Sequence, residues 1–525
     1  MVHGDYRSTL SPARRLALEV TTKLRIRNAF ASKLIASDID SSALSLEDKA
    51  FAARLVLGVV ATQGTLDELI DAKLHNQQDL EPRVRDALRI SCFEIMFLEK
   101  SSYAAVDQGV ELVREVTHKA TGLANAVLRK IAEEKPRFPF GDPKSDIAAF
   151  ARLHAFPTWI AKQLVSELGY KAAKEFMEAS NESAPLFIAV NYLKVGEEEV
   201  RKVFEQAGAK LFDVCLDEKS HTIHACSSPG GRKILLLGDK NVQFDSESLG
   251  LGSASGTGTS AGASRGDERD LQGAKEGEDG RYQVVIPGCF QLREARSLQH
   301  PEIIKLMSKG KILISDAASQ FVANYVLPKS APAAFLEVGS GRGTKSILLQ
   351  SGAKRRFGKQ MPLQVLDKHR FKLGLLEERA ALFGLRIEAA HELDACALVE
   401  HFEPASFDAV FIDAPCSGLG TLRRHPEIRW RIREEDIAEL AERAFLMLVQ
   451  AAEIVKVGGV LSYSTCTVTR AENQEVVKRF LRSELGEGFR MEPVADDPAG
   501  KPYFESRLCK ASSDAHFAVR LERMS

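Results

Sequence analysis

The chain has 525 residues, which is too long for one typical hydrophobic core and predicts about two to four domains. Hydrophobic residues make up 44% and charged residues 27% of the sequence, a balance that indicates a soluble globular protein. The formal net charge of -1 excludes a broadly basic surface, so any nucleic-acid binding must come from local basic patches.

The eight cysteines are scattered and form no Cys-x-x-Cys pair. Neither a zinc site nor a disulfide framework is therefore predicted, and a reducing cytosol is the expected compartment. The first fifteen residues, MVHGDYRSTLSPARR, lack the apolar core of a signal peptide. No apolar run is long enough to span a bilayer, so we expect a cytoplasmic protein with no metal and no membrane segment.

Residues 11–134 are predicted to be helical. Ser11-Pro12 fits the start of a first helix, because proline is favoured in the first turn. Apolar residues then recur at helical spacing, as Leu55, Val56 and Val59 do. The pattern predicts a bundle with one core, and we assign residues 1–138 to this domain.

Three runs within this bundle also resemble a known module. They are DKAFAARLVLGVVATQGTLDELI, LRISCFEIMFLEKSSYAAVDQGVELVRE and GLANAVLRKI. The runs resemble the NusB-like RNA-binding helical domain, in particular the copy that is fused to bacterial rRNA cytosine methyltransferases. The resemblance, and not the periodicity, implies that this domain binds RNA.

Residues 139–246 are predicted to form a helical linker and a small α+β unit. Strands are expected over Pro185–Asn191, Ala209–Cys215 and Ser220–Cys226, with a helix over Glu197–Ala207. The unit resembles the RNA-recognition-like part of the same family. The next segment, 247–281, is rich in Gly, Ser and Thr and buries too little apolar area to offset its ordering entropy, so we predict a disordered insertion.

Residues 282–525 alternate between strand and helix patterns, which predicts a Rossmann-like α/β domain with a parallel, doubly wound sheet. Strands are expected at Ala334–Val338, Leu363–Leu366, Leu385–Ala389, Ala409–Ile412, Val460–Tyr463 and Phe517–Leu521. The main helices are expected at Lys368–Phe383, Glu434–Lys456 and Ala471–Leu481.

A glycine-rich loop follows the first of these strands. It reads Gly339-Ser340-Gly341-Arg342-Gly343-Thr344-Lys345-Ser346. Glycines let a backbone approach a ligand closely at the start of a helix. The loop lacks the G-x-G-x-x-G of dinucleotide-binding folds, and Thr344 stands where a P-loop needs its second glycine. An ATPase therefore remains a near alternative.

A site for S-adenosylmethionine is the third interpretation of this loop. Such a site expects an acid after the second strand for the ribose hydroxyls and another near the adenine, where Asp367 and Asp394 stand. Asp413 follows a further strand. One strand-end Asp is often only a helix cap, but three after successive strands favour a methyltransferase.

Two cysteines stand in polar loops at strand ends, where ligands bind in such sheets. Cys416 follows Asp413-Ala414-Pro415, and Cys466 follows Ser464-Thr465. The other cysteines are interpreted as small buried hydrophobic residues. They are Cys92, Cys215, Cys226, Cys289, Cys396 and Cys509.

The stretches DAPCSGLG (Asp413–Gly420) and YSTCT (Tyr463–Thr467), with Glu472-Asn473, resemble the two signature motifs of RNA cytosine-C5 methyltransferases. Together with the NusB-like segment they resemble the 16S rRNA members of the RsmB (Sun) type. The resemblance covers nearly the whole chain apart from the insertion. It implies S-adenosylmethionine as cofactor and 16S rRNA as partner, and we expect a monomer.

The resemblance also implies residue roles. Cys466 would be the nucleophile that adds to carbon 6 of cytosine, Cys416 would assist product release, and Asp413 would bond or protonate the N3 edge. The cofactor would lie along Gly339–Lys345, bordered by Asp413, with Asp367 on the ribose and Asp394 near the adenine. The family usually has Asp-x-Cys-Ala-Ala-Pro-Gly-Gly-Lys-Thr here; Gly343 and Lys345 align with it, while Arg342 replaces the proline.

The densest basic stretch beside the Cys416 loop runs from Leu422 to Arg433. Arginines bind phosphates and a tryptophan can stack on a base, so this stretch is predicted to contact RNA. The predicted contacts are Arg423, Arg424, Arg429, Trp430 and Arg431. The alternative is a solvated loop with Trp430 packed into the core.

Three other functions are weighed against this one. A P-loop NTPase has no use for the paired cysteines, and a non-catalytic RNA-binding protein has no use for Asp413 and the two thiols. A DNA cytosine methyltransferase would use the Pro-Cys thiol as its nucleophile, but the helical N-terminal domain has no place in it.

Overall fold

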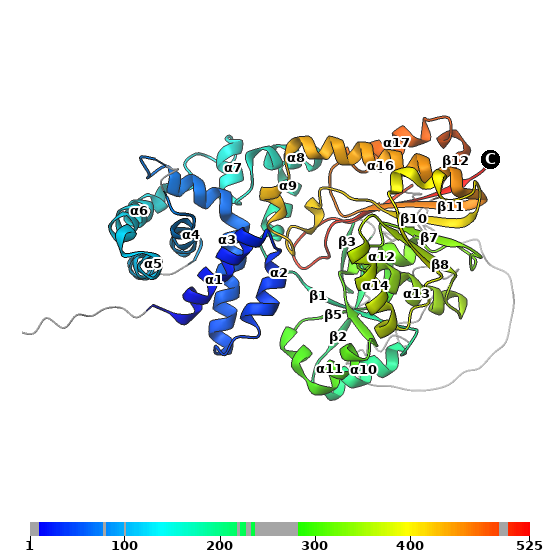
Figure 1. Ribbon diagram of the computed structural model, residues 1–525, viewed down its shortest axis with the longest axis horizontal. Coiled ribbons are helices and arrows are strands. Elements are labelled where there is room, and N and C mark those ends of the chain that lie inside the picture. The colour runs from blue at the N-terminus through cyan, green and yellow to red at the C-terminus, as the bar shows by residue number, and fades with distance from the viewer. Residues whose placement is uncertain are drawn as a thin grey trace, which may run out of the picture.

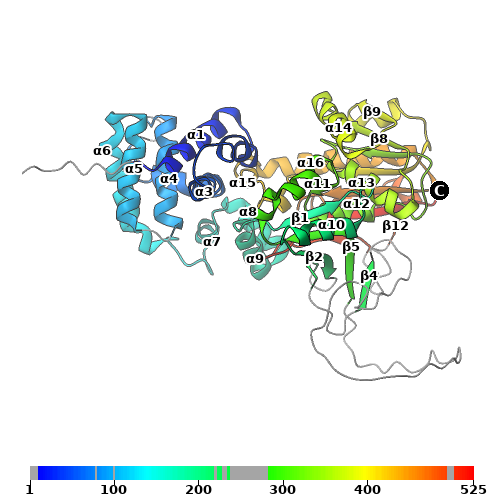
Figure 2. The same ribbon diagram turned by 90° about the horizontal axis from the view of Figure 1, so that it is seen from below.

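The computed structural model describes residues 10–76, 80–98, 101–217, 221–226, 233–236, 282–492 and 502–525. The disordered insertion predicted for 247–281 lies outside these ranges. A helical N-terminal part lies beside a larger part that contains two sheets (Figures 1 and 2). Among the described residues, no helix is both long and apolar enough to cross a membrane.

The N-terminal part is a helical bundle, which confirms the prediction for residues 11–134. Its apolar stripes meet in one core, in which Leu55, Leu88 and Leu112 are fully buried. Pro12 occupies the first turn of the first helix, as expected. The main helices are α1 (Pro12–Arg27), α2 (Ala31–Leu34), α3 (Leu46–Asp71), α4 (Pro82–Phe97), α5 (Ser102–Val116) and α6 (Thr121–Glu134).

Three linker helices follow, namely α7 (Ile147–Leu153), α8 (Thr158–Leu168) and α9 (Tyr170–Ser180). Their apolar core is shared with the second half of the chain. Phe150 and Phe176 pack in one cluster with Leu419 and Leu422, which directly follow the Cys416 loop. The linker therefore supports the loop that carries a predicted catalytic cysteine.

The small α+β unit is built on a sheet with the order β3-β2-β5-β1-β6, and β4 pairs with β5. With α10 (Glu197–Gln206) and α11 (Pro301–Ser308), the order β6-β1-β5-β2 is that of a ferredoxin-like βαββαβ unit. The strands are β1 (Leu186–Val190), β2 (Leu211–Asp217), β3 (Thr222–Ala225), β4 (Lys233–Leu236), β5 (Tyr282–Leu292) and β6 (Ile312–Ile314).

This topology corrects the predicted domain boundary at residue 282. Strands β5 and β6 both pair with β1, so residues 282–314 complete the small sheet instead of starting the α/β domain. Val284 and Ile286 of β5 are buried in the same core as Phe187 of β1. The composition changes sharply at the insertion, but the insertion separates two strands of one sheet.

The second sheet has the order β12-β14-β11-β10-β7-β8-β9, with β13 on β14. Strands β11, β10, β7, β8 and β9 are parallel, as predicted, whereas β14 is antiparallel to its neighbours β11 and β12, so the sheet is mixed. The strands are β7 (Phe335–Val338), β8 (Leu363–Asp367), β9 (Ala389–Glu392), β10 (Phe407–Asp413), β11 (Val455–Thr465), β12 (Phe489–Glu492), β13 (Phe504–Glu505) and β14 (Phe517–Arg523).

Helices pack on both faces of this sheet, as Figure 1 shows. They include α12 (Ala317–Tyr325), α13 (Thr344–Phe357), α14 (Arg370–Phe383), α16 (Glu434–Ile454) and α17 (Gln474–Leu481). The strand predicted over Leu385–Ala389 was placed too early, because the N–H of Leu385 still bonds to the carbonyl of Ala380 and closes α14.

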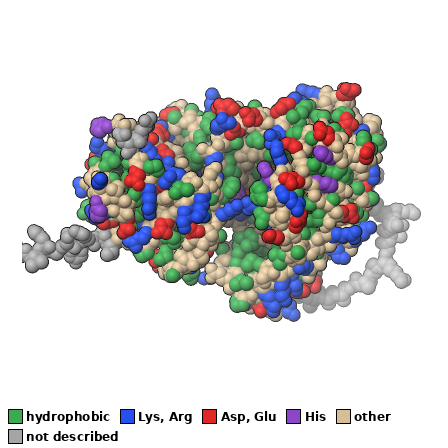
Figure 3. Space-filling view, in the orientation of Figure 1, with side chains coloured by type: hydrophobic (Ala, Val, Ile, Leu, Met, Phe, Trp, Pro, Cys, Tyr) green, Lys and Arg blue, Asp and Glu red, His purple; other side chains and the backbone are tan. Residues whose placement is uncertain are grey.

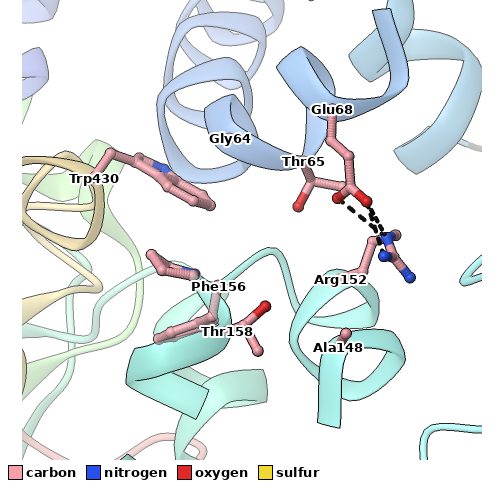
Figure 4. A pocket seen from close by; sticks show the side chains of 9 residues that line it. Gly64, Thr65, Glu68, Ala148, Arg152, Phe156, Thr158 and Trp430 are labelled. Atoms are coloured by element: carbon pink, nitrogen blue, oxygen red, sulfur yellow. Dashed lines mark hydrogen bonds and ion pairs between the residues drawn. The ribbon is translucent and has the colours of Figure 1, made fainter. Parts of the chain in front are cut away.

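A short helix, α15 (Ile428–Arg431), joins the α/β domain to the helical bundle. Trp430 Nε1 donates to the carbonyls of Val60 and Ala61 at 2.9 and 3.2 Å. Its ring fills the space beside Gly64 of α3, where an added Cβ would lie 2.2 Å from the ring. A pocket of about 280 Å³ lies at this junction, and the Arg152–Glu68 ion pair, 2.8 Å long, is on its far side from Trp430 (Figure 4).

We predict that Gly64→Ala weakens this junction, because the new methyl group must displace the Trp430 ring. Overpacking of this kind costs about 1–3 kcal/mol, which exceeds the gain of about 1 kcal/mol that alanine brings to a helix. Urea unfolding followed by tryptophan fluorescence measures the effect. Gly122→Ala is the matched control, since nothing lies within 4 Å of its added Cβ; equal stability of the two variants would contradict the prediction.

Candidate active site

The two cysteine loops leave the sheet side by side, because β10 and β11 are parallel neighbours in which Asp413 pairs with Ser464. This register places Cys416 Sγ 3.4 Å from Cys466 Sγ. The backbone N–H of Cys466 also donates to Cys416 Sγ at 3.3 Å. Two thiols that lie fifty positions apart in the sequence thus share one site.

Asp413 lies at the same end of β10 and holds two partners. Lys345 Nζ donates to its Oδ2 at 2.7 Å, and Ser464 Oγ donates to its Oδ1 at 3.1 Å. The Asp413 side chain is still 27% exposed, so a ligand can reach it. Burial alone would lower the pKa of Lys345, but the Asp413 carboxylate outweighs burial and raises that pKa, so Lys345 stays charged.

Cys416 is more deeply enclosed than an ordinary surface thiol. Its hydrogen bond with Cys466, followed by burial, raises the pKa of Cys416 well above the usual value. The charge of Glu472 acts in the same direction. Cys416 is therefore a protonated thiol at neutral pH.

The glycine loop turns between β7 and α13 as the sequence predicts. Gly339, Gly341 and Gly343 all have positive φ angles, of 82°, 56° and 78°. A Cβ on Gly339 would lie 2.4 Å from the carbonyl oxygen of Asp413, so only glycine fits there. The loop backbone thus passes directly over the end of β10, next to the catalytic candidates.

The other loop residues have identifiable positions. Ser340 N–H and Oγ donate to the carbonyl of Leu366, at 3.0 and 3.3 Å. The carbonyl of Arg342 and the hydroxyl of Thr344 both accept bonds from Arg379, at 2.9 and 3.0 Å. The Arg342 side chain is exposed at the edge of the site.

The predicted cofactor acids lie along the same edge of the sheet. Asp367 ends β8, and its carboxylate accepts bonds from the N–H groups of Gly341 and His369, at 3.1 and 2.9 Å. Asp394 follows β9, caps the N–H of Cys396 at 3.0 Å and pairs with Lys368 at 2.7 Å. A glycine-rich backbone turn and two nearby carboxylates fit a ligand that has ribose hydroxyls and an exocyclic amine.

Glu337 and Glu472 belong to the site although the sequence analysis gave them no role. Glu337 on β7 is fully buried, and Ser346 Oγ donates to it at 2.6 Å. Burial raises the pKa of Glu337 to about 8. Glu472 stands three residues after Thr469, and its place beside Asn473 in the motif after Cys466 was the signal available in the sequence.

The predicted RNA contacts of the basic stretch are corrected for three residues. Arg429 is fully buried, and its guanidinium donates to Asn181 Oδ1 at 2.8 Å. Arg423 is buried and donates to the carbonyl of Ser512 at 2.7 Å. Trp430 packs on α3, as the alternative interpretation had it. These three side chains bond to or pack against other segments of the same chain. They are therefore not available to bind RNA.

The other two predicted RNA contacts, Arg424 and Arg431, are partly accessible. Arg424 is paired with Asp316 and Asp514, at 2.8 and 2.9 Å. Arg431 is exposed, although its guanidinium donates to the carbonyl of Ala29 at 2.6 Å. Figure 3 shows a hollow beside the helical part, with Lys and Arg side chains gathered at it.

Comparison with known proteins finds family matches for two parts of the chain. Residues 335–501 match the family of 16S rRNA methyltransferases RsmB/F, and residues 11–133 match the NusB family. A probable ribosomal RNA small subunit methyltransferase B of Bacillus subtilis is 28% identical over 473 residues, which are 89% of this chain and 88% of the relative. A putative methyltransferase of Mycobacterium tuberculosis is 27% identical, over 99% of each chain.

A solved structure has the same fold over nearly the whole chain. The crystal structure of PH0851 superposes with a TM-score of 0.70 at 19% identity, and covers 98% of this chain and 100% of its own. At this identity the likeness supports the fold, including the placement of the helical bundle with the two sheets.

We predict that Glu337→Gln flattens the pH dependence of stability. The folded protein keeps the Glu337 proton up to about pH 8, whereas the unfolded chain releases it above the ordinary pKa of 4.5. Unfolding therefore releases a proton in this window, and the free energy of unfolding falls by up to about 1.4 kcal/mol per pH unit. Denaturant unfolding at several pH values measures the slope. The same slope in Glu337→Gln as in the wild type would exclude this origin, and the exposed Glu484→Gln is the control.

Proposed function

We propose that the chain, whose residues 335–501 match the family of 16S rRNA methyltransferases RsmB/F, methylates carbon 5 of a cytosine through a covalent adduct with Cys466. The observation that carries the proposal is the contact of Cys416 and Cys466 at 3.4 Å, beside the Asp413 carboxylate. Two thiols and a carboxylate at the ends of two neighbouring strands suit nucleophilic catalysis followed by elimination.

Cytosine carbon 5 is a poor nucleophile, and a thiolate overcomes this. Cys466 Sγ forms a bond to carbon 6, and the electron pair of the carbon 5–carbon 6 double bond becomes available at carbon 5. S-adenosylmethionine, when bound, supplies the methyl group that carbon 5 takes. Asp413 is suited to hold the N3 edge and its proton while the adduct forms, since it is accessible and fixed by Lys345 and Ser464.

Product release requires that carbon 5 lose its proton and that the carbon 6–sulfur bond break. Once Cys466 is bonded to the base, Cys416 loses the hydrogen bond that contributes most to its raised pKa. Cys416 then passes its thiol proton to solvent, and the resulting thiolate takes the carbon 5 proton. The electron pair of that carbon–hydrogen bond restores the double bond, the carbon 6–sulfur bond breaks, and Cys466 leaves as thiolate. The resting structure thus keeps Cys416 protonated until the adduct exists.

The cofactor and RNA would approach from neighbouring sides. Gly339–Lys345, Asp367 and Asp394 lie along the edge formed by β7, β8 and β9, and the cysteine loops lie at β10 and β11. The target base must leave its stack to reach Cys466. We assign RNA binding to residues 1–138, to the small α+β unit and to Arg424 and Arg431, and we propose that the protein acts as a cytoplasmic monomer.

The P-loop alternative is disfavoured by the contacts of its key residue. Lys345 Nζ is bonded to the Asp413 carboxylate at 2.7 Å, beside the thiols, and its amine is largely buried. A P-loop lysine must instead be free to reach the phosphates of a nucleotide.

We predict that Cys466→Ala abolishes methyl transfer from labelled S-adenosylmethionine to unmodified 16S rRNA, because no other group forms the carbon 6 bond. Cys416→Ala is expected to accumulate a protein–RNA adduct that survives a denaturing gel, since the elimination step is impaired. Cys509→Ser, outside the site, is the control and retains activity. Full activity of Cys466→Ala would refute the covalent mechanism. Absence of an adduct in Cys416→Ala would refute the role of Cys416 in product release.

A further inference from the structure

Glu472 is a buried carboxylate that contacts both cysteine loops. It is 1% exposed. From the Cys416 loop, the N–H and the hydroxyl of Ser417 donate to its two oxygens, each at 2.6 Å. From the Cys466 loop, the hydroxyls of Thr469 and Thr467 donate to it at 2.7 and 3.3 Å.

The donors of Glu472 are direct neighbours of the reactive groups. Ser417 follows Cys416 and Thr467 follows Cys466, and their two hydroxyls are themselves 2.6 Å apart. Tyr463 OH fixes the backbone of Glu472 by donating to its carbonyl at 2.6 Å. The carboxylate therefore joins the two loops at the residues that directly follow the two thiols.

The charge of Glu472 has no cationic partner among the residues that the structure describes; its contacts there are hydroxyl and N–H donors. The ionisable groups that face Cys416 are Cys466, Glu472 and Tyr463. Of these, Glu472 is the one whose negative charge opposes ionisation of Cys416 while bonding to its neighbour.

We propose that Glu472 is a positioning residue for methyl transfer, whose buried carboxylate joins the two cysteine loops at the residues that follow the two thiols. The inference rests on the roles proposed above for Cys466 and Cys416. The side chain touches neither the substrate nor the cofactor in this account, and acts through Ser417, Thr467 and Thr469.

The test is alkylation of each thiol by iodoacetamide as a function of pH, followed by mass spectrometry, in the full chain. Glu472→Gln keeps a carbonyl for the Ser417 N–H but removes the charge. We expect Cys416 to be alkylated at lower pH than in the wild type, and kcat to fall about tenfold with KM for RNA unchanged. Glu475→Gln is the matched control, since Glu475 is exposed and paired with Lys478 on α17.

An unchanged Cys416 profile in folded Glu472→Gln overturns the inference. Should that variant fail to fold, Ser417→Ala provides the second test, because it removes one hydroxyl bond to Glu472 and keeps the N–H bond. It is expected to lower kcat by a smaller factor; wild-type kcat would overturn the positioning role. Alkylation needs neither RNA nor cofactor, so these outcomes are distinct from activity in Cys466→Ala, which would instead overturn the proposed function.

Discussion

The parallel pairing of β10 with β11 is the constraint on which the site depends. With Asp413 opposite Ser464, the two strands end at the same level. Cys416 and Cys466 follow within a few residues of these strand ends, so the two thiols lie in contact. The carbonyl of Ser464 also accepts the N–H of Ala414 at 2.9 Å, which extends the pairing into the loop. A shift of this register by one residue would turn every side chain to the opposite face and separate the thiols.

The charges of the site are arranged around this pairing. Lys345 comes from α13 and neutralises Asp413, and Glu337 on the neighbouring strand β7 holds its proton, so the buried centre carries fewer net charges than its composition indicates. Glu472 is the exception, since it is buried and bonded to neutral donors. Hydrogen bonds to a charged group contribute about 1.5–3 kcal/mol each, so the four donors around Glu472 offset part of the cost of burying its carboxylate.

The proximity of the strand-end motifs could be predicted from the sequence, because the carboxyl ends of neighbouring parallel strands meet at one end of the sheet. Asp367, Asp394 and Asp413 follow β8, β9 and β10, and these strands lie on one parallel sheet with β7. Long-range contacts were not predictable in the same way. Nothing local shows that Arg429 is enclosed by residues of α9, or that β5 returns to β1 beyond a long insertion, because both depend on partners far along the chain.

The burial of the basic stretch indicates a structural role for most of its side chains. Between Gly420 and Arg433 the chain passes from the Cys416 loop to α15, and its side chains bond to α9, to α3 and to the loop before α2. The same segment thus follows the Cys416 loop at one end and contacts the helical bundle at the other. A displacement of the helical bundle on RNA binding would also move this segment, because Trp430 and Arg429 are held by packing and by hydrogen bonds to backbone carbonyls. The two cysteine loops and the helical bundle are therefore connected through packed residues that themselves need not touch RNA.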